Sequence, residues 1–301
     1  MITTHLGSPL CLPVKINDHL KKLEIPPKHR TYINPRAMGE HIKEAEYGYL
    51  DSWLVFNEGE PKFYDIKQGR TGDCYLLGAL AGIAANHPSI IASMIQPSDE
   101  GSYQVRFYTP LGTPLWIKID PCFLGDKTDG KLIYAKTPLT QNGDAIIWPA
   151  LVEKAYAYFI NECDKLLGER RRGFDKIGKG GYAHQALFHL TGKLPETIKL
   201  DQCTINDVIA IGRNAAQGTV TLVGSKEKDL PLHLQPNHIF TVLGFNEITD
   251  NLILYDPHGV NYTNAQKGER KKNSNGVIEI DCQSFLNHFS DATFASKKAD
   301  H

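Results

Sequence analysis

Residues 68–77 read Gln68-Gly69-Arg70-Thr71-Gly72-Asp73-Cys74-Tyr75-Leu76-Leu77, and an apolar run follows them. Gly69 and Gly72 predict a tight, exposed turn before a helix, and Asp73 suits the N-cap of that helix. Cys74 then falls in the first helical turn, where unpaired N–H groups and the positive end of the helix dipole favour a thiolate. Because the helix is apolar nearly all round, we expect it to be buried, with only its first turn open to a surface. This pattern is typical of a cysteine nucleophile.

The composition is that of an ordinary globular protein. The chain has 301 residues, of which 41% are hydrophobic and 22% charged, enough for one or two domains. The formal net charge of -1 argues against nucleic acid or an anionic membrane as the main partner. No stretch approaches the ~20 apolar residues that span a bilayer, so we expect no membrane span. The oligomeric state is not predicted.

The N-terminus and the cysteines bear on the compartment. Met1 to His5 contain no basic region followed by an apolar run, so we expect no secretory signal peptide. The six cysteines are scattered, without zinc-binding spacing, and would be free thiols in a reducing compartment. We expect a cytoplasmic protein. Export by a route that needs no leader is the alternative.

The first half of the sequence predicts an N-terminal extension and a helix-rich subdomain. Residues 1–52 form the extension, with an extended arm, a short helix around 16–23 and a second helix over 37–47. Residues 53–193 form the helix-rich subdomain that carries the cysteine. Its other predicted elements are a strand over 53–56, a hairpin of 103–107 and 115–119, a loop over 122–144, and helices from 148 and over 183–190.

Residues 194–301 predict a β-rich subdomain, so the fold class is α+β. A helix over 205–216 leads into antiparallel strands, and a final helical turn occupies 285–289. The predicted strands cover 219–223, 238–245, 252–255 and 277–280. Two subdomains of this kind form a cleft at their interface, where ligands commonly bind.

A cysteine nucleophile needs a base, and the base needs an orienting partner. His238 opens one predicted strand and Asp256 closes the next. The turn between these strands makes them antiparallel neighbours, so His238 and Asp256 are expected to lie side by side. A carboxylate beside the imidazole fixes its tautomer and favours its cation, which in turn favours a Cys74 thiolate.

These segments resemble the calpain family of cysteine proteases. Residues 68–77 resemble its signature Gln-Gly-x-x-Gly-Asp-Cys-Trp-Leu-Leu, and Asn237 to Val242 resemble its Gly-His-Ala-Tyr-Ser-Val. Residues 256–259 resemble its Asn-Pro-Trp-Gly. Similar matches at Trp148 to Ala157 and at Phe285 to Phe289 extend the resemblance over about residues 53–295.

The resemblance implies a papain-like α+β fold and a cysteine endopeptidase. By it, Cys74 attacks the peptide bond and forms an acyl-enzyme, and His238 acts as base and then as acid. Asp256 orients His238, and Gln68 joins the Cys74 backbone N–H as a donor to the oxyanion. The implied partner is a protein substrate.

Three residues depart from the family pattern. Asp256 replaces an asparagine, although Cys-His-Asp triads occur in other papain-like enzymes, including bacterial effector proteases. Tyr75 and His258 replace two tryptophans, the second of which helps to gate the cleft in calcium-dependent calpains. The chain contains no Asp-x-Asp-x-Asp-Gly loop, and Asp175 is the one acidic residue that we place in the calcium-binding loops of calpain cores. We therefore expect no required cofactor and leave calcium as the alternative.

Two other functions are compatible with these residues. Papain-like sites also deamidate glutamine or transfer acyl groups, because the thioester intermediate is common to all three reactions. An exported effector with such an activity is the first alternative. A non-catalytic calpain-like binding module is the second, and the intact set Gln68, Cys74, His238 and Asp256 argues against it.

Overall fold

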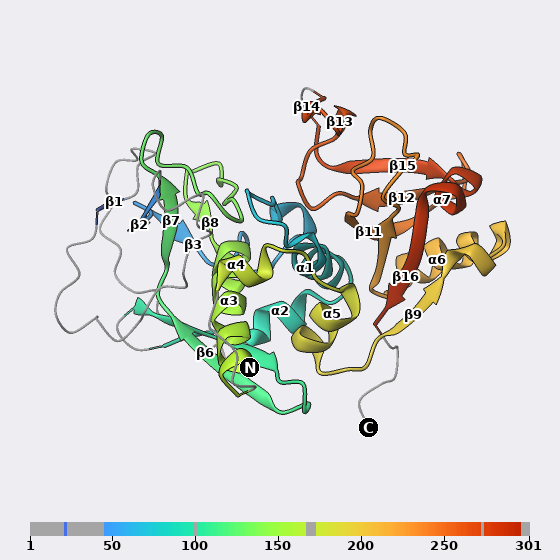
Figure 1. Ribbon diagram of the computed structural model, residues 1–301. Coiled ribbons are helices and arrows are strands. Elements are labelled where there is room, and N and C mark those ends of the chain that lie inside the picture. The colour runs from blue at the N-terminus through green and yellow to red at the C-terminus, as the bar shows by residue number, and fades with distance from the viewer. Residues whose placement is uncertain (1–20, 23–44, 99–100, 167–172, 272–273, 296–301) are drawn as a thin grey trace, which may run out of the picture.

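The computed structural model describes residues 21–22, 45–98, 101–166, 173–271 and 274–295 (Figure 1). Up to residue 193 the elements are β1 (Lys21–Lys22), β2 (Ala45–Tyr49), β3 (Trp53–Leu54), α1 (Cys74–Asn86), α2 (Pro88–Met94), β4 (Ile95–Pro97), β5 (Tyr103–Tyr108), β6 (Pro114–Ile119), β7 (Cys122–Asp126), β8 (Ala145–Ile146), α3 (Trp148–Leu166), α4 (Phe174–Ile177) and α5 (Ala183–Thr191). From residue 194 they are β9 (Glu196–Lys199), α6 (Ile205–Ala216), β10 (Thr221–Ser225), β11 (Ile239–Asn246), β12 (Asn251–Tyr255), β13 (Tyr262–Asn264), β14 (Glu269–Arg270), β15 (Val277–Asp281), α7 (Cys282–His288) and β16 (Phe289–Phe294). The molecule therefore combines helices with antiparallel sheets, in an α+β arrangement.

The first part is built around α1 and α3. Both helices contribute to one hydrophobic core, which the antiparallel sheet β4-β5-β6 also lines. Side chains of α3 also donate hydrogen bonds to groups outside the helix. Trp148 donates through Nε1 to Asp65 at 2.8 Å, and the Lys154 ammonium donates to the Cys122 carbonyl at 2.6 Å. These bonds satisfy groups that burial would otherwise leave unpaired.

The second part is a six-stranded sheet with the order β15-β12-β11-β10-β16-β9, in which every neighbouring pair is antiparallel. Alternate residues of its strands belong to different cores. Leu222 packs with α1, whereas Val223 and Phe240 pack with α6 and α7. Figure 1 accordingly shows α1 on one side of the sheet and α6 on the other.

Glycines allow α1 to lie close to this sheet. A Cβ atom on Gly82 would lie 2.8 Å from Cγ1 of Val220, and one on Gly78 would lie 3.1 Å from Cγ2 of Ile239. The Thr241 hydroxyl of β11 donates to the Gly78 carbonyl at 2.7 Å. The helix that begins at Cys74 is therefore fixed directly against the strands that lead to His238 and Asp256.

Most predicted elements are present at the expected places. The helix after Asp73, the hairpin β5–β6, the helices α3, α5 and α6, and the strands β10, β11, β12 and β15 are confirmed. The strand predicted over 53–56 covers only Trp53–Leu54. The final helical turn is part of α7, and the following strand β16 was not predicted, nor was β9.

Three predictions about the first part are wrong or incomplete. The loop over 122–144 contains β7, which pairs with β2, so residues 45–47 are strand and do not end a helix. The same strand β2 pairs with Lys21–Lys22, which contradicts the end of the helix around 16–23. The remaining residues of both predicted helices lie outside the described residues. The physical reason is that each of these short strands exists only through its partner.

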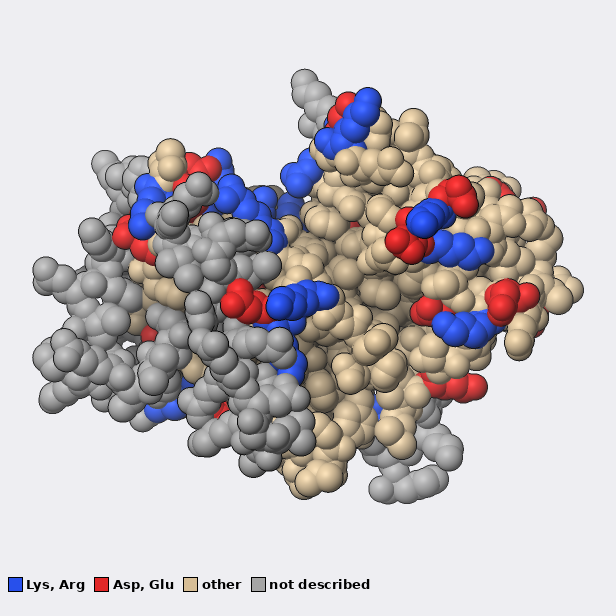
Figure 2. All heavy atoms as spheres, viewed as in Figure 1, with Lys and Arg blue, Asp and Glu red and all other residues tan. Residues whose placement is uncertain are grey.

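Three further observations describe the molecule as a whole. Among the described residues no single helix is long and apolar enough to cross a membrane; α1 and α2 meet that test jointly, but they bend by 116° at the break between them. Charged side chains of both signs are interspersed over the described part of the face in Figure 2. Cys74, Cys122, Cys163, Cys203 and Cys282 are free thiols.

Candidate active site

The turn before Cys74 is shaped by two glycines that allow other backbone segments to approach. A Cβ atom on Gly69 would lie within 2.4 Å of the Ile133 and Tyr134 carbonyl groups, and one on Gly72 would lie 2.6 Å from the Gly178 oxygen. The Arg70 backbone N–H donates to the Ile133 carbonyl at 2.8 Å. No larger residue fits at either glycine without moving backbone, so the sequence pattern and the local path of the chain explain each other.

Cys74 is the first residue of α1 and is 9% exposed. At this position its backbone N–H has no acceptor within the helix. Its side chain is one of the groups that raise the pKa of the His238 ring. Asp73 holds the N-cap position, but its side chain makes no capping hydrogen bond. The expected helix, the cysteine in its first turn and the N-cap position of Asp73 are confirmed, but the side-chain hydrogen bond that a cap supplies is missing.

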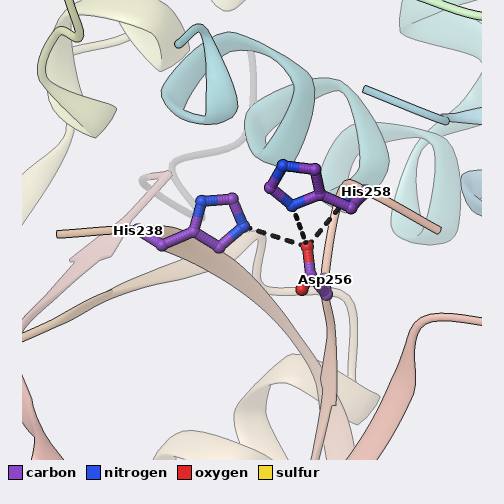
Figure 3. Close-up of side chains that lie close together, drawn as sticks. All are labelled: His238, Asp256 and His258. Carbon is purple, nitrogen blue, oxygen red and sulfur yellow. Dashed lines mark hydrogen bonds and ion pairs between the residues drawn. The ribbon is translucent and has the colours of Figure 1, made fainter. Parts of the chain in front are cut away.

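His238 and Asp256 meet as the strand arrangement predicted. Thr241 of β11 pairs with Tyr255 of β12, so the strand ends that carry His238 and Asp256 are neighbours. The His238 Nε2 and the Asp256 Oδ1 are 2.9 Å apart, and the two side chains are 6% and 4% exposed. Figure 3 shows the His238 ring directed at the carboxylate.

His258 is a third member of this group, and sequence reasoning gave it no role. Its Nδ1 lies 2.9 Å from the same Asp256 Oδ1, and its backbone N–H donates to that oxygen at 2.8 Å (Figure 3). Its ring stacks on that of His238, with centroids 4.7 Å apart and planes 26° from parallel. The available signal was a histidine two residues after the candidate orienting carboxylate.

The charges in this group support one another. Burial alone raises the pKa of Asp256, but the His238 and His258 rings outweigh it and hold the pKa well below the usual range. Burial alone lowers the pKa of His238, but Asp256 and Cys74 outweigh it and raise the pKa to about 10. Burial and repulsion from His238 lower the pKa of His258 despite its bond to Asp256. Asp256 is therefore a carboxylate, and both rings donate N–H to it.

Gln68 begins the glycine turn that leads to Cys74. Its Nε2 donates to the Thr71 carbonyl at 2.7 Å, which leaves the second N–H of the amide for another acceptor. Within the described residues its buried Oε1 has no hydrogen-bond partner. The Gln68 backbone N–H donates to the Pro257 carbonyl at 2.8 Å. This bond connects the turn before the cysteine to the loop between Asp256 and His258.

Two buried carboxyl groups, Asp73 and Glu153, include the residue directly before the cysteine. They are 0% and 1% exposed and influence each other's pKa, although neither oxygen of the Asp73 carboxyl group has a hydrogen-bond partner among the described residues. Burial raises the pKa of Asp73 to about 7, and burial together with the Asp73 charge raises the pKa of Glu153 well above its usual range. Burial disfavours the charged form of both groups, and two neighbouring carboxylates repel each other, so ionisation of the pair is displaced to higher pH.

The side chains that could bind a metal ion together do not include Asp175. Asp175 lies on α4, and the structure places no group of His, Cys, Asp or Glu ligand atoms around it in the described ranges. His238, Asp256 and His258 form such a group, with ligand atoms within 4.8 Å of one another.

Comparison with known proteins identifies a family for this geometry. The calpain family cysteine protease profile matches residues 48–261. The chain is 30% identical over 208 residues to the calpain-type cysteine protease DEK1 of Arabidopsis thaliana, which covers 63% of the chain and 9% of that protein. It is 26% identical over 210 residues to calpain-13 of Rattus norvegicus, covering 64% of the chain and 27% of that protein. It is 27% identical over 192 residues to the calpain-2 catalytic subunit of Mus musculus, covering 61% of the chain and 25% of that protein. The chain thus matches only a minor part of the length of these relatives.

Proposed function

The chain belongs to the calpain family of cysteine proteases, and on that premise we propose that it is a papain-like cysteine endopeptidase that cleaves protein substrates. Cys74 is the nucleophile, His238 the base and then the acid, and Asp256 the residue that orients His238. The observation that carries this proposal is the 2.9 Å contact between the His238 ring and the Asp256 carboxylate, at the ends of strands that pack against α1, the helix that begins at Cys74.

The reaction follows from these positions. The Cys74 thiolate attacks the carbonyl carbon of the scissile peptide bond. The proton is then on the His238 Nδ1, the ring nitrogen that does not contact Asp256. His238 then gives that proton to the leaving amine, and a thioester remains on Cys74. Water, deprotonated by His238, attacks the thioester and releases the acid. Asp256 keeps the ring in one orientation throughout both steps.

Gln68 is the proposed side-chain donor to the oxyanion. Its Nε2 is held in place by the Thr71 carbonyl, and the second N–H is available for the developing charge. The backbone N–H of Cys74, at the start of α1, is the second donor. Removing one oxyanion donor typically lowers kcat by about 10²–10³-fold, so Gln68→Ala tests this role without touching the triad.

We also propose that the two halves of the site need no calcium to align. The Tyr255 hydroxyl donates to the Ile66 carbonyl at 2.6 Å, and the Gln68 N–H donates to the Pro257 carbonyl at 2.8 Å. Together with the bond from Thr241 to Gly78, these contacts tie the cysteine side to the histidine side. They support an arrangement in which the protein itself aligns the triad.

The decisive experiment compares the wild-type chain with Cys74→Ala on an unstructured protein substrate such as casein. We expect wild type to produce internal cleavages and the variant to lose at least about 10³-fold in kcat/KM, because no second nucleophile replaces the thiol. Cys203→Ala removes a half-exposed thiol far from the triad in sequence and serves as the matched control. Cleavage that persists in a folded Cys74→Ala protein would refute the proposal.

The same experiment separates the alternatives when the products are read by mass spectrometry. An endopeptidase leaves two new chain ends, a glutamine deamidase adds about one mass unit to an intact substrate, and an acyltransferase adds a group, although all three pass through a thioester. A binding module changes no mass. We favour the endopeptidase because the family match covers both the cysteine and the histidine-bearing strand.

A further inference from the structure

The nitrogen atoms of two imidazole rings converge on one oxygen atom of the triad aspartate. The His238 Nε2 and the His258 Nδ1 each lie 2.9 Å from the Asp256 Oδ1 (Figure 3). A ring nitrogen that donates a hydrogen bond directs its lone pair along the same line once the proton has left. The two lone pairs would therefore point at the position of the Asp256 Oδ1, and the carboxylate has to move back for an ion to enter between the three ligand atoms.

This donor set selects a class of ion. Two imidazoles and one carboxylate suit zinc and its neighbours in the first transition series, whereas calcium and magnesium prefer oxygen ligands alone. Zinc binds histidine nitrogen at about 2.0–2.1 Å and carboxylate oxygen at about 2.0–2.2 Å. In a tetrahedral site of that size the ligand atoms lie roughly 3.3–3.5 Å apart, as follows from these bond lengths. The 2.9 Å contacts between these atoms need to open by only about half an ångström.

We propose that His238, Asp256 and His258 form a binding site for Zn²⁺ that competes with catalysis. On binding, the ion replaces the N–H proton on the His238 Nε2 and that on the His258 Nδ1, and both protons go to solvent. Asp256 turns from accepting these hydrogen bonds to coordinating the ion. A water molecule completes the tetrahedron on the side of His258, which is 17% exposed and is the most open of the three side chains.

The consequence for the reaction rests on the proposed function. Zinc on the Nε2 removes the contact by which Asp256 orients His238. A ring nitrogen that binds zinc carries no proton, so the ring cannot become doubly protonated. The base and acid role of His238 is then blocked while the ion is bound. Because His258 stands where the resembling family has tryptophan, the third ligand is a property of this chain.

The test measures binding on Cys74→Ala, so it does not depend on activity. Removing the thiol also removes the simplest rival, an ion held between Cys74 and His238. We expect isothermal titration calorimetry with Zn²⁺ to show one site per chain. His258→Gln should weaken that site by more than about tenfold, because even the outer partners of metal ligands contribute that much. His184→Gln, at an exposed histidine on α5, is the matched control and should leave it unchanged.

Spectroscopy on the same Cys74→Ala protein identifies the ligands. X-ray absorption at the zinc edge should show a shell of nitrogen and oxygen with imidazole scattering and no sulfur. His258→Trp, which places the family residue in the loop, should bind as weakly as His258→Gln. Equal zinc binding by the His258 variants and the control would overturn the proposal. So would zinc binding that is found in the wild-type chain but is lost in Cys74→Ala. Failure of the peptidase assay would not affect this result.

Discussion

Asp256 is the residue at which this chain departs from the asparagine of its family, and the structure explains how the aspartate is used. Its Oδ1 accepts the two ring N–H groups and the His258 backbone N–H. A single acceptor oxygen is enough for the bond to His238. The carbonyl oxygen of an asparagine side chain offers that acceptor without the negative charge.

We therefore expect Asp256→Asn to keep much of the peptidase activity and Asp256→Ala to lose far more, by about 10²-fold or greater, because alanine leaves the His238 ring unoriented. Steady-state kcat/KM on one peptide substrate checks this. The wild-type chain and Asp291→Asn, a change of the same kind on β16, are the controls. Equal losses in both Asp256 variants would mean that the carboxylate charge itself is required.

The buried pair of Asp73 and Glu153 predicts how stability depends on pH. The pKa of Asp73 is raised by burial from 3.8 to about 7, so above about pH 4 the unfolded chain loses a proton that the folded chain keeps. The free energy of unfolding should then fall as the pH rises from about 4 through about 7. The slope is at most ~1.4 kcal/mol per pH unit for each proton.

Glu153→Gln tests this directly. The amide still accepts from the Ala135 N–H, as the Glu153 carboxyl group does at 3.0 Å, and it donates to an ionised Asp73. We expect a flatter pH dependence between pH 5 and 8 in urea unfolding, with wild type and variant converging below pH 4. Glu227→Gln changes an exposed carboxylate and should reproduce the wild-type slope. A wild-type slope in Glu153→Gln would mean that ionisation of Glu153 does not contribute to the pH dependence.

At the scale of elements, the sequence predicted the helices and hairpins whose signals lie within a short stretch of the chain. The helix α6 was predicted with its observed bounds, and the structure adds that Thr204 and Asp207 form a reciprocal cap at its start. The pair β11–β12 was predicted because a polar turn joins two apolar runs. The neighbourhood of His238 and Asp256 follows from that pair alone.

The elements that were missed depend on distant partners. Residues 122–126 are buried without alternation, and they become a strand by pairing with Ala45–Tyr49, far away in the sequence. The strand β16 follows α7 with no intervening turn, so no signal separated it from the helix. In the sequence, His258 was identified only as the replacement of a tryptophan in the family pattern. Its role depends on a shared carboxylate oxygen, which no spacing rule specifies.

The close contact of α1 with the sheet yields a prediction about Gly82. A side chain there would meet Val220 Cγ1 at 2.8 Å and Thr241 Cγ2 at 3.3 Å. We expect Gly82→Val to lower the free energy of unfolding by about 1–3 kcal/mol through overpacking. It should also lower peptidase activity, because α1 carries Cys74. Urea denaturation and the peptide assay measure the two effects.

A second substitution shows whether the clash is the cause. Val220→Ala removes the atom that the new side chain would meet, so the double variant should be more stable than the sum of the two single effects by at least about 0.5 kcal/mol. Additive effects would place the origin of the instability elsewhere in α1.

At the scale of the whole molecule, the alignment of the site depends on contacts between segments far apart in the chain. The Ile66 carbonyl accepts from the Tyr255 hydroxyl, and both groups are buried. A Cβ on Gly259 would lie 2.9 Å from Cγ of Lys67, so the loop after His258 also packs on the segment before the nucleophile. Interfaces this close are expected to hold the two sides of the site in one arrangement.

We therefore expect an epoxysuccinyl thiol probe to label Cys74 equally fast with calcium and with chelator, as measured by mapping the adduct by mass spectrometry. Tyr255→Phe leaves the Ile66 carbonyl without its buried donor, at a cost of about 1–3 kcal/mol, and should slow labelling severalfold. Tyr64→Phe, which removes the hydroxyl of an exposed ring, should not. If calcium were needed to label the wild-type chain, the contacts of Tyr255 and Gln68 would not be what aligns the site, because both are already made without the ion.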